Sequence, residues 1–156
     1  MSRKSCRKVR KALLAAYSSL YTFKSYGDRL RCAYCGDVRE SVDHIPPISV
    51  VDAVTPAKLR ELEVDLISVP CCLACNNTLG ALKLGTYEER LHYLYHNLQI
   101  KMESSVFWSN AEIEELAGNL QSMVLNRQLV LRAECLLRLR GMERAMCALE
   151  NDTSED

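Results

Sequence analysis

The chain has 156 residues, of which 48% are hydrophobic and 26% charged, and its formal net charge is zero. These proportions are typical of a soluble globular protein, and no apolar run approaches the roughly 18 residues that span a bilayer. The length favours one domain, or a small core with an appended helical region. The stretch after the basic N-terminus is broken by Tyr and Ser and lacks a cleavage pattern, so we expect a cytoplasmic protein without a signal peptide.

The net charge of zero conceals an uneven distribution of charge along the chain. Residues 1–11 contain six basic side chains and no acidic one, whereas residues 150–156 contain four acidic side chains and no basic one. We expect the acidic end to be a disordered tail, and the basic end either to contact nucleic-acid phosphates or to be a solvated helix start. The predicted phosphate contacts in this segment are Arg3, Lys4, Arg7, Lys8 and Lys11.

The N-terminal segment, residues 1–29, is expected to form a basic helix. Apolar residues recur at spacings of three and four between residues 4 and 24, which is the pattern of an amphipathic helix. The composition changes over residues 27–42, where two glycines and a Cys-x-x-Cys motif indicate a knuckle or hairpin. We expect this hairpin to end in a strand through residues 40–43.

Short elements are predicted in the middle of the chain. Thr55 before Pro56 is the pattern of an N-cap with proline at the first helical position, and it predicts a short helix through Glu63. Residues 66–69 predict a strand that Pro70 ends, and a helix is expected from about residue 72 to about residue 84. The fold class is therefore α+β and helix-rich, with a small β-containing insert that holds the cysteines.

Two capping-box patterns, Thr86 with Glu89 and Ser109 with Glu112, predict the starts of two further helices. The first is expected to run to about residue 101. The second is expected to run to about residue 139, where Gly141 would cap or kink it before a final short helical piece.

The predicted helical region, residues 86–149, carries more apolar surface than a small core could cover. The excess lies on one face of residues 116–139. This face either folds back with the N-terminal helix or forms an interface with a second copy or with a partner protein.

Four cysteines form two half-sites with the spacing of a structural zinc site. Cys32 and Cys35 enclose two residues, as do Cys72 and Cys75, so each pair can aim both sulfurs at one point. Together they supply four thiolates in tetrahedral geometry, the closed arrangement of structural zinc, and the alternative is a set of buried free thiols. Cys71 could replace Cys72, but pairing of residues i and i+3 at a helix start is the commoner half-site. We expect zinc binding to stabilise this segment.

An Asp-His-Ile-Pro-Pro segment lies between the half-sites, and an asparagine directly follows the last cysteine. The order is Cys32-x2-Cys35, Asp43-His44-Ile45-Pro46-Pro47, Cys72-x2-Cys75-Asn76. In these elements the sequence resembles the HNH, or His-Me finger, nucleases, and most closely their zinc-stapled members of the endonuclease VII branch. The resemblance covers residues 30–85 and implies a zinc-stabilised ββα-metal core there, with flanking helices at both ends.

The resemblance implies roles for three residues. His44 would be the general base that activates water, and Asp43 and Asn76 would hold a catalytic Mg²⁺ or Mn²⁺. The residue types suit these roles, since imidazole accepts a proton near neutral pH and phosphodiester hydrolysis needs a counter-charge. Asp43 and His44 are neighbours on a predicted strand, so their side chains should point to opposite faces. Lys83 could reach a phosphate, although it lies later in the chain than the family's lysine.

The resemblance therefore implies a metal-dependent HNH endonuclease, an enzyme that hydrolyses phosphodiester bonds, and we expect its substrate to be DNA. The alternative is a non-catalytic four-cysteine zinc module that binds nucleic acid or a partner protein. Convergence of Asp43, His44 and Asn76 on one centre would favour the nuclease, and splayed side chains would favour the binding module. The middle Asn that often orients the family's catalytic His has no clear counterpart here.

Overall fold

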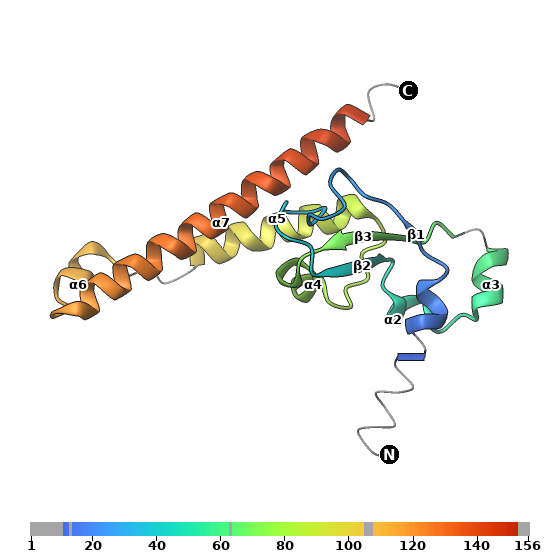
Figure 1. Cartoon of the computed structure of the whole chain (residues 1–156), viewed down its shortest axis with the longest axis horizontal. Coiled ribbons are helices and arrows are strands. Elements are labelled where there is room, and N and C mark those ends of the chain that lie inside the picture. The colour runs from blue at the N-terminus through green and yellow to red at the C-terminus, as the bar shows by residue number, and fades with distance from the viewer. Residues whose placement is uncertain (1–10, 13, 63, 105–107, 153–156) are drawn as a thin grey trace, which may run out of the picture.

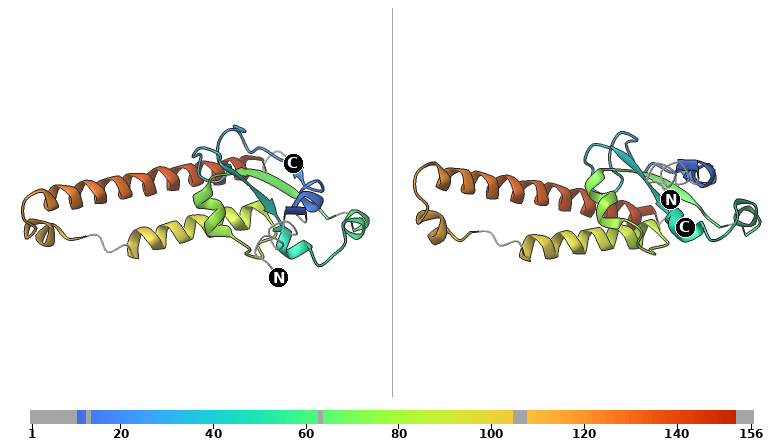
Figure 2. Two further views of the ribbon diagram at one scale, coloured as in Figure 1. Left: turned by 60° about the horizontal axis from the view of Figure 1, so that its bottom comes forward. Right: turned by 90° about the horizontal axis from the view of Figure 1, so that it is seen from below.

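The computed structural model describes residues 11–12, 14–62, 64–104 and 108–152. A small sheet with short helices forms one end of the molecule, and the helices α5 and α7 extend away from it (Figure 1). Two further views show that these helices lie side by side along their length (Figure 2). Within the described residues, none of the helices combines the length and the apolar character needed to cross a membrane.

A three-stranded sheet with the strand order β1-β3-β2 holds the compact end together. β1 is Thr22–Phe23, β2 is Ser41–Ile45 and β3 is Ile67–Cys71. β2 and β3 are antiparallel, whereas β1 pairs in parallel with the start of β3. The middle strand, β3, is buried along its whole length, which accounts for its mostly apolar sequence.

The first helix is shorter than the sequence predicted. Residues 11–12 and 14–18 are helical, but the chain then leaves the helix to form β1. The N–H of Thr22 donates to the carbonyl of Leu66 at 2.8 Å, so sheet pairing outweighs the helical periodicity in this β-favouring stretch. The predicted helix residues before Lys11 lie outside the described residues.

Pro70 does not end β3, contrary to the prediction. The strand continues to Cys71, with Pro70 in register opposite Val42. Proline has no N–H to donate, but the carbonyl oxygen of Pro70 accepts from the N–H of Ala33 at 2.8 Å. The cysteine loop around Ala33 therefore takes the place of a neighbouring strand at this point.

Two short helices, α2 (Ile48–Val51) and α3 (Pro56–Glu61), fill the connection between β2 and β3. The predicted N-cap of α3 is confirmed, because the side chain of Thr55 accepts from the N–H of Lys58. After β3 comes α4 (Leu73–Leu79). β2, β3 and α4 therefore form a strand–strand–helix unit.

α4 begins with one of the cysteines. Cys72 is its N-cap, and the sulfur accepts from the N–H of Cys75 at 3.4 Å. The helix ends at Gly80, which has a φ of 49°, and not near residue 84 as predicted. Glycine allows this positive φ without the steric cost that other residues incur, so the local conformation overrides the helical pattern that continues beyond it.

Both predicted capping boxes are present. Thr86 Oγ1 accepts from the N–H of Glu89 at 3.1 Å, and Glu89 Oε2 accepts from the N–H of Thr86 at 3.1 Å, at the start of α5 (Tyr87–Ser104). The Ser109 box in the same way opens α6 (Asn110–Glu114).

The helix predicted from residue 109 to about residue 139 is in fact two helices. α6 is followed by Gly118, with a φ of 61°, and α7 then runs over Asn119–Asp152. The sequence predicts a cap or kink at Gly141, but α7 continues through this residue. A Cβ atom at Gly141 would overlap with the carbonyl oxygen of Cys35, so the glycine lets α7 pass close to the first cysteine half-site.

Two buried clusters stabilise the fold. The larger joins the cysteines and the sheet to α5 and α7, and includes Tyr34, Val69, Leu91, Leu94 and Met142. The smaller lies between the first helix, α2 and α3, and consists of Tyr17, Tyr21, Ile48, Val51, Leu59 and Leu66. The cysteine centre thus belongs to the main core of the protein.

Candidate functional site

Four thiols converge where the loop before β2 meets the end of β3. The sulfurs of Cys32, Cys35, Cys72 and Cys75 all lie within 4.8 Å of one another, and all four residues are buried. The sulfurs of Cys35 and Cys72 are 3.7 Å apart, close to the roughly 3.8 Å expected for a tetrahedral site with Zn–S bonds of about 2.3 Å. Among the described residues, no other group of three or more His, Cys, Asp or Glu side chains is placed to hold an ion.

The loop that carries the first half-site is folded by backbone hydrogen bonds. The N–H of Cys32 donates to the carbonyl of Asp37 at 2.7 Å, and the N–H of Gly36 donates to the carbonyl of Cys32 at 2.9 Å. Gly36 has a φ of 76°, which permits the sharp turn directly after Cys35. The residue after the first motif is therefore part of the metal centre's architecture.

Cys71 is not part of this group, which agrees with the predicted choice of Cys72. Its sulfur donates to the carbonyl of Cys72 at 3.4 Å. Within the group, hydrogen bonds with the other three thiols lower the pKa of Cys72 and raise the pKa of Cys75. Zinc binding requires the four thiols to lose their protons, so zinc affinity should fall as the pH falls.

Helix α7 closes one side of the metal centre with Arg138. Its Nη2 donates to the sulfur of Cys75 at 3.3 Å. Burial alone would lower the pKa of Arg138, but the sulfur of Cys75 holds it above its usual range. Its Nε is buried without a hydrogen-bond partner among the described atoms. Four thiolates and one Zn²⁺ leave two net negative charges, and Arg138 offsets part of that charge.

Asp43 has different partners from those that the sequence predicted. Its two carboxylate oxygens accept from Nη1 of Arg90 at 2.9 and 2.8 Å, and one of them also accepts from the Tyr34 hydroxyl at 2.6 Å. Arg90 is fully buried and donates in addition to the carbonyls of Leu82 and Leu84. In this arrangement the guanidinium neutralises the carboxylate, so Asp43 does not offer its charge to a catalytic ion.

His44, Asn76 and Asp43 line one cavity of about 740 Å³ beside β2. His44 is half-buried and packs edge-on against Tyr21, with ring centroids 4.8 Å apart and an interplanar angle of 83°. The Tyr21 hydroxyl donates to the carbonyl of Pro46 at 2.7 Å, which fixes the orientation of the tyrosine. Nδ2 of Asn76 donates to Oγ of Ser41 at 3.2 Å, so its carbonyl oxygen is the group that can accept from a ligand.

The environment of His44 favours the neutral imidazole. Burial lowers the pKa of His44 below its usual 6.5, the attraction of Asp43 opposes this shift in part, and the charge of Arg90 adds to it. His44 can therefore act as a proton acceptor at neutral pH. Asp52, which the sequence did not single out, also lines this cavity.

The basic residues predicted to contact nucleic acid are only partly described. Lys11 is helical and exposed, and Leu14, one helical turn later, lies in the wall of the His44 cavity. Lys83 is exposed between α4 and α5 and does not line the cavity. The predicted contacts that lie outside the described residues are Arg3, Lys4, Arg7 and Lys8.

The structure thus brings together the four cysteines, and separately His44, Asn76 and Asp43 around one cavity, where the carboxylate of Asp43 is paired with Arg90. Sequence reasoning missed Arg90, Arg138 and the close approach at Gly141, because all three act on residues far away in the chain. Comparisons with protein-family models, with curated proteins and with solved structures found no match for this chain. What the site shows is a four-cysteine centre suited to structural zinc.

Proposed function

We propose that the chain is a nuclease of the HNH type that hydrolyses phosphodiester bonds in DNA at the cavity lined by His44 and Asn76. One observation carries the proposal. Two side chains from distant parts of the chain line one cavity next to the metal centre, and a hydrogen bond from Asn76 to Ser41 joins the helix and the strand that hold them. Asn76 directly follows the zinc ligand Cys75, so an ion in the centre would fix its position.

The residues of the cavity can activate water. His44, neutral at neutral pH, accepts a proton from a water molecule while the oxygen of that water forms a bond to phosphorus and the bond to the leaving oxygen breaks. The carbonyl oxygen of Asn76 accepts a hydrogen bond from the second O–H of the same water and so orients this water. Tyr21 holds the imidazole ring in position from the side. The leaving oxygen takes its proton from solvent.

The resemblance to HNH nucleases also implies Mg²⁺ or Mn²⁺, which would offset the charge that develops on the phosphate oxygens. The predicted ligand set does not fit such an ion in this structure. Asp43 is neutralised by Arg90, and a single neutral oxygen from Asn76 is too weak a ligand set for a divalent cation. The proposed steps therefore rest on His44 and Asn76, and dependence on a divalent ion is a variable of the test.

Positive charge near the cavity supports a polyanionic substrate. Lys11 precedes Leu14, a residue of the cavity wall, by one helical turn, so its ammonium group is carried by the same element. Lysine side chains in such a place contact the phosphate backbone without reading the bases. Cleavage by this protein should accordingly weaken with rising salt concentration.

A second candidate is a zinc module that binds nucleic acid without cleaving it. The observation that favours it is the buried pair of Asp43 and Arg90, which withdraws the one carboxylate expected at a nuclease centre. A structural pair of this kind is as useful in a binding module as in an enzyme.

One experiment separates the two candidates. Supercoiled plasmid is incubated with the full chain in Mg²⁺, in Mn²⁺ and in EDTA, and binding is measured in parallel by gel shift. The nuclease proposal predicts nicked or linear product, and roughly a 100-fold loss of rate in Asn76→Ala at unchanged zinc content. Retarded DNA without cleavage in every metal condition would refute the nuclease and support the binding module.

A further inference from the structure

The outer half of α7 carries apolar side chains that no part of the described chain covers. One stripe of α7, at spacings of three and four, borders the groove between α7 and α5 and is exposed along its length: Leu120 51%, Met123 66%, Val130 49% and Leu137 64%. Two charged residues, Arg127 and Glu134, lie in the same stripe and are also exposed. Exposed apolar residues in a continuous row on a protein surface mark a contact with another molecule.

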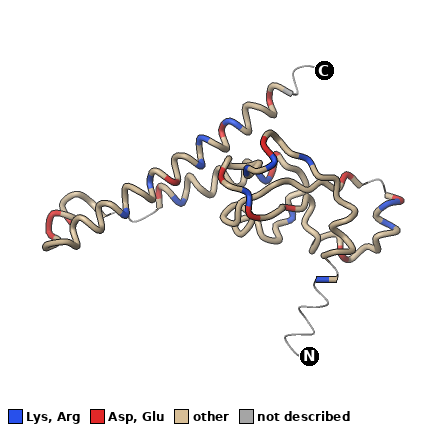
Figure 3. The backbone as a smooth tube through the Cα atoms, viewed as in Figure 1, with Lys and Arg blue, Asp and Glu red and all other residues tan. Residues whose placement is uncertain are grey.

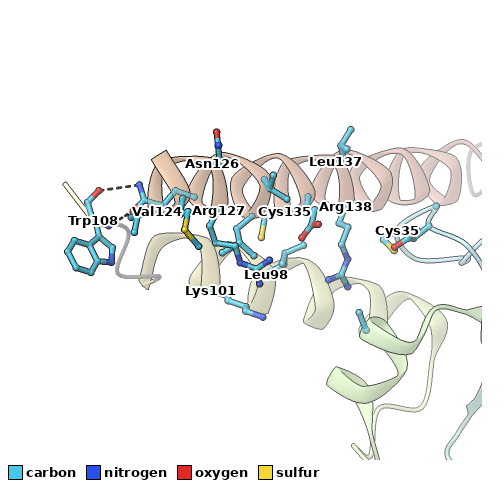
Figure 4. Close-up of a pocket in the computed structure, with 18 of the residues that line it drawn as sticks. Cys35, Leu98, Lys101, Trp108, Val124, Asn126, Arg127, Cys135, Leu137 and Arg138 are labelled. Carbon is cyan, nitrogen blue, oxygen red and sulfur yellow. Dashed lines mark hydrogen bonds between the residues drawn. The ribbon is translucent and has the colours of Figure 1, made fainter. Parts of the chain in front are cut away.

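This stripe lines a groove along the helical hairpin. The groove has a volume of about 1520 Å³ and extends from Trp108 at the far end to Cys35 beside the metal centre, with Leu98 and Lys101 of α5 on its other side. Figure 4 shows Leu98 and Lys101 beside α7, with Trp108 at one end and Cys35 at the other. Small-molecule pockets hold about 300–1,000 Å³, so a groove of this size and elongated form suits a helix better than a metabolite.

The stripe is complementary to a second copy of itself that runs in the opposite direction. From Met123 onward it reads apolar, basic, apolar, acidic, apolar: Met123, Arg127, Val130, Glu134 and Leu137. If two such stripes run antiparallel about a two-fold axis at Val130, Met123 of each copy lies opposite Leu137 of the other. Arg127 of each copy then lies opposite Glu134 of the other. Along α7 as a whole, basic and acidic residues are interspersed (Figure 3).

We propose that α7 pairs with α7 of a second copy of this chain, antiparallel and centred on Val130, so that two α5–α7 hairpins form a four-helix dimer. Arg127 and Glu134 form no ion pair within the described part of the chain. In the dimer each of them has a partner in the other copy, so that two Arg127–Glu134 pairs form. The stripe from Leu120 to Leu137 is about 26 Å long at 1.5 Å per residue. This proposal concerns the interface and does not depend on nuclease activity.

The test uses charge reversal in the full chain, with mass measured by light scattering or sedimentation. The wild type is expected at twice the monomer mass of 17.7 kDa. Arg127→Glu and Glu134→Arg each place like charges opposite each other twice, and each should weaken dimerisation by about 100-fold. The double variant R127E/E134R restores both pairs and should dimerise again.

A mixture gives the sharpest result. Arg127→Glu carries acidic residues at both positions and Glu134→Arg carries basic residues at both, so equal amounts of the two should form a heterodimer although neither dimerises alone. Both positions are exposed, so helicity and zinc content should not change. A monomeric wild type would overturn the proposal. Single variants that still dimerise, or a mixture that stays monomeric, would overturn it as well.

Discussion

Replacing Arg90 by methionine removes the partner of a buried carboxylate and should strongly destabilise the protein. The Arg90 side chain is 0% exposed and the Asp43 side chain 5% exposed, so the remaining charge cannot reach water. Two charge-assisted hydrogen bonds are lost, and the Tyr34 hydroxyl alone is left to solvate the carboxylate. Removing one partner of such a pair costs about 3–5 kcal/mol. For a chain of this length, this amounts to a fall in Tm of roughly 10–15 °C.

The assay is a double-mutant cycle with Arg90→Met, Asp43→Ala and the double variant, followed by urea or thermal unfolding. The double variant should be less destabilised than the sum of the single variants, with a coupling energy of about 2–3 kcal/mol. The exposed pair of Lys58 and Glu61 provides the control, because Lys58→Met should cost about 0.5 kcal/mol or less. A single variant Arg90→Met with wild-type stability would refute the assignment of Asp43 to the core.

Four further predictions concern the metal centre and the cavity. Arg138→Gln should weaken zinc binding by about 10-fold in a chelator competition, because Arg138 donates to a ligand sulfur, and an unchanged affinity would contradict this. Gly141→Ala should destabilise by about 1–3 kcal/mol in thermal unfolding, although alanine is usually the better helix former, and a stabilised variant would show that α7 does not contact the cysteine loop. Cys35→Ser should lower zinc content and melting temperature together, and a protein that melts as the wild type does without zinc would refute the centre. The rate of DNA cleavage should be constant near neutral pH and fall only below pH 6.5, because burial lowers the pKa of His44. The lowered pKa also means that the unfolded chain binds a proton more readily than folded His44 does, so this residue's contribution to stability falls with the pH in the same window. A cleavage rate that already falls while the pH is still above 7 would contradict the lowered pKa of His44.

The local features of the fold were predictable because their causes are local. A Cys-x-x-Cys motif aims two sulfurs at one point whatever surrounds it, and a capping box such as Thr86 with Glu89 closes its hydrogen bonds within four residues. Helix ends were less predictable. The backbone at Gly80 and Gly118 adopts a positive φ inside stretches whose apolar pattern continues, and periodicity alone does not detect such a break.

The contacts between distant segments could not be predicted from the sequence. Alternation along a strand predicts that Asp43 and His44 point to opposite faces, but it could not show that Arg90 would meet Asp43. The short β1 strand owes its existence to hydrogen bonds with Leu66 and Ser68 and not to its own two residues. The contact of Arg138 could not be predicted for the same reason, because its partner, Cys75, lies on another helix.

The most direct test of the central claim, that a zinc-held cavity uses His44 to hydrolyse DNA, is the nicking rate of His44→Ala at matched zinc content. His92→Ala, which removes an exposed histidine of α5 outside the cavity, is the matched control. We expect a loss of at least about 100-fold in His44→Ala, with wild-type zinc content and Tm, and no loss in the control. A His44→Ala variant that cleaves DNA at the wild-type rate would contradict the claim.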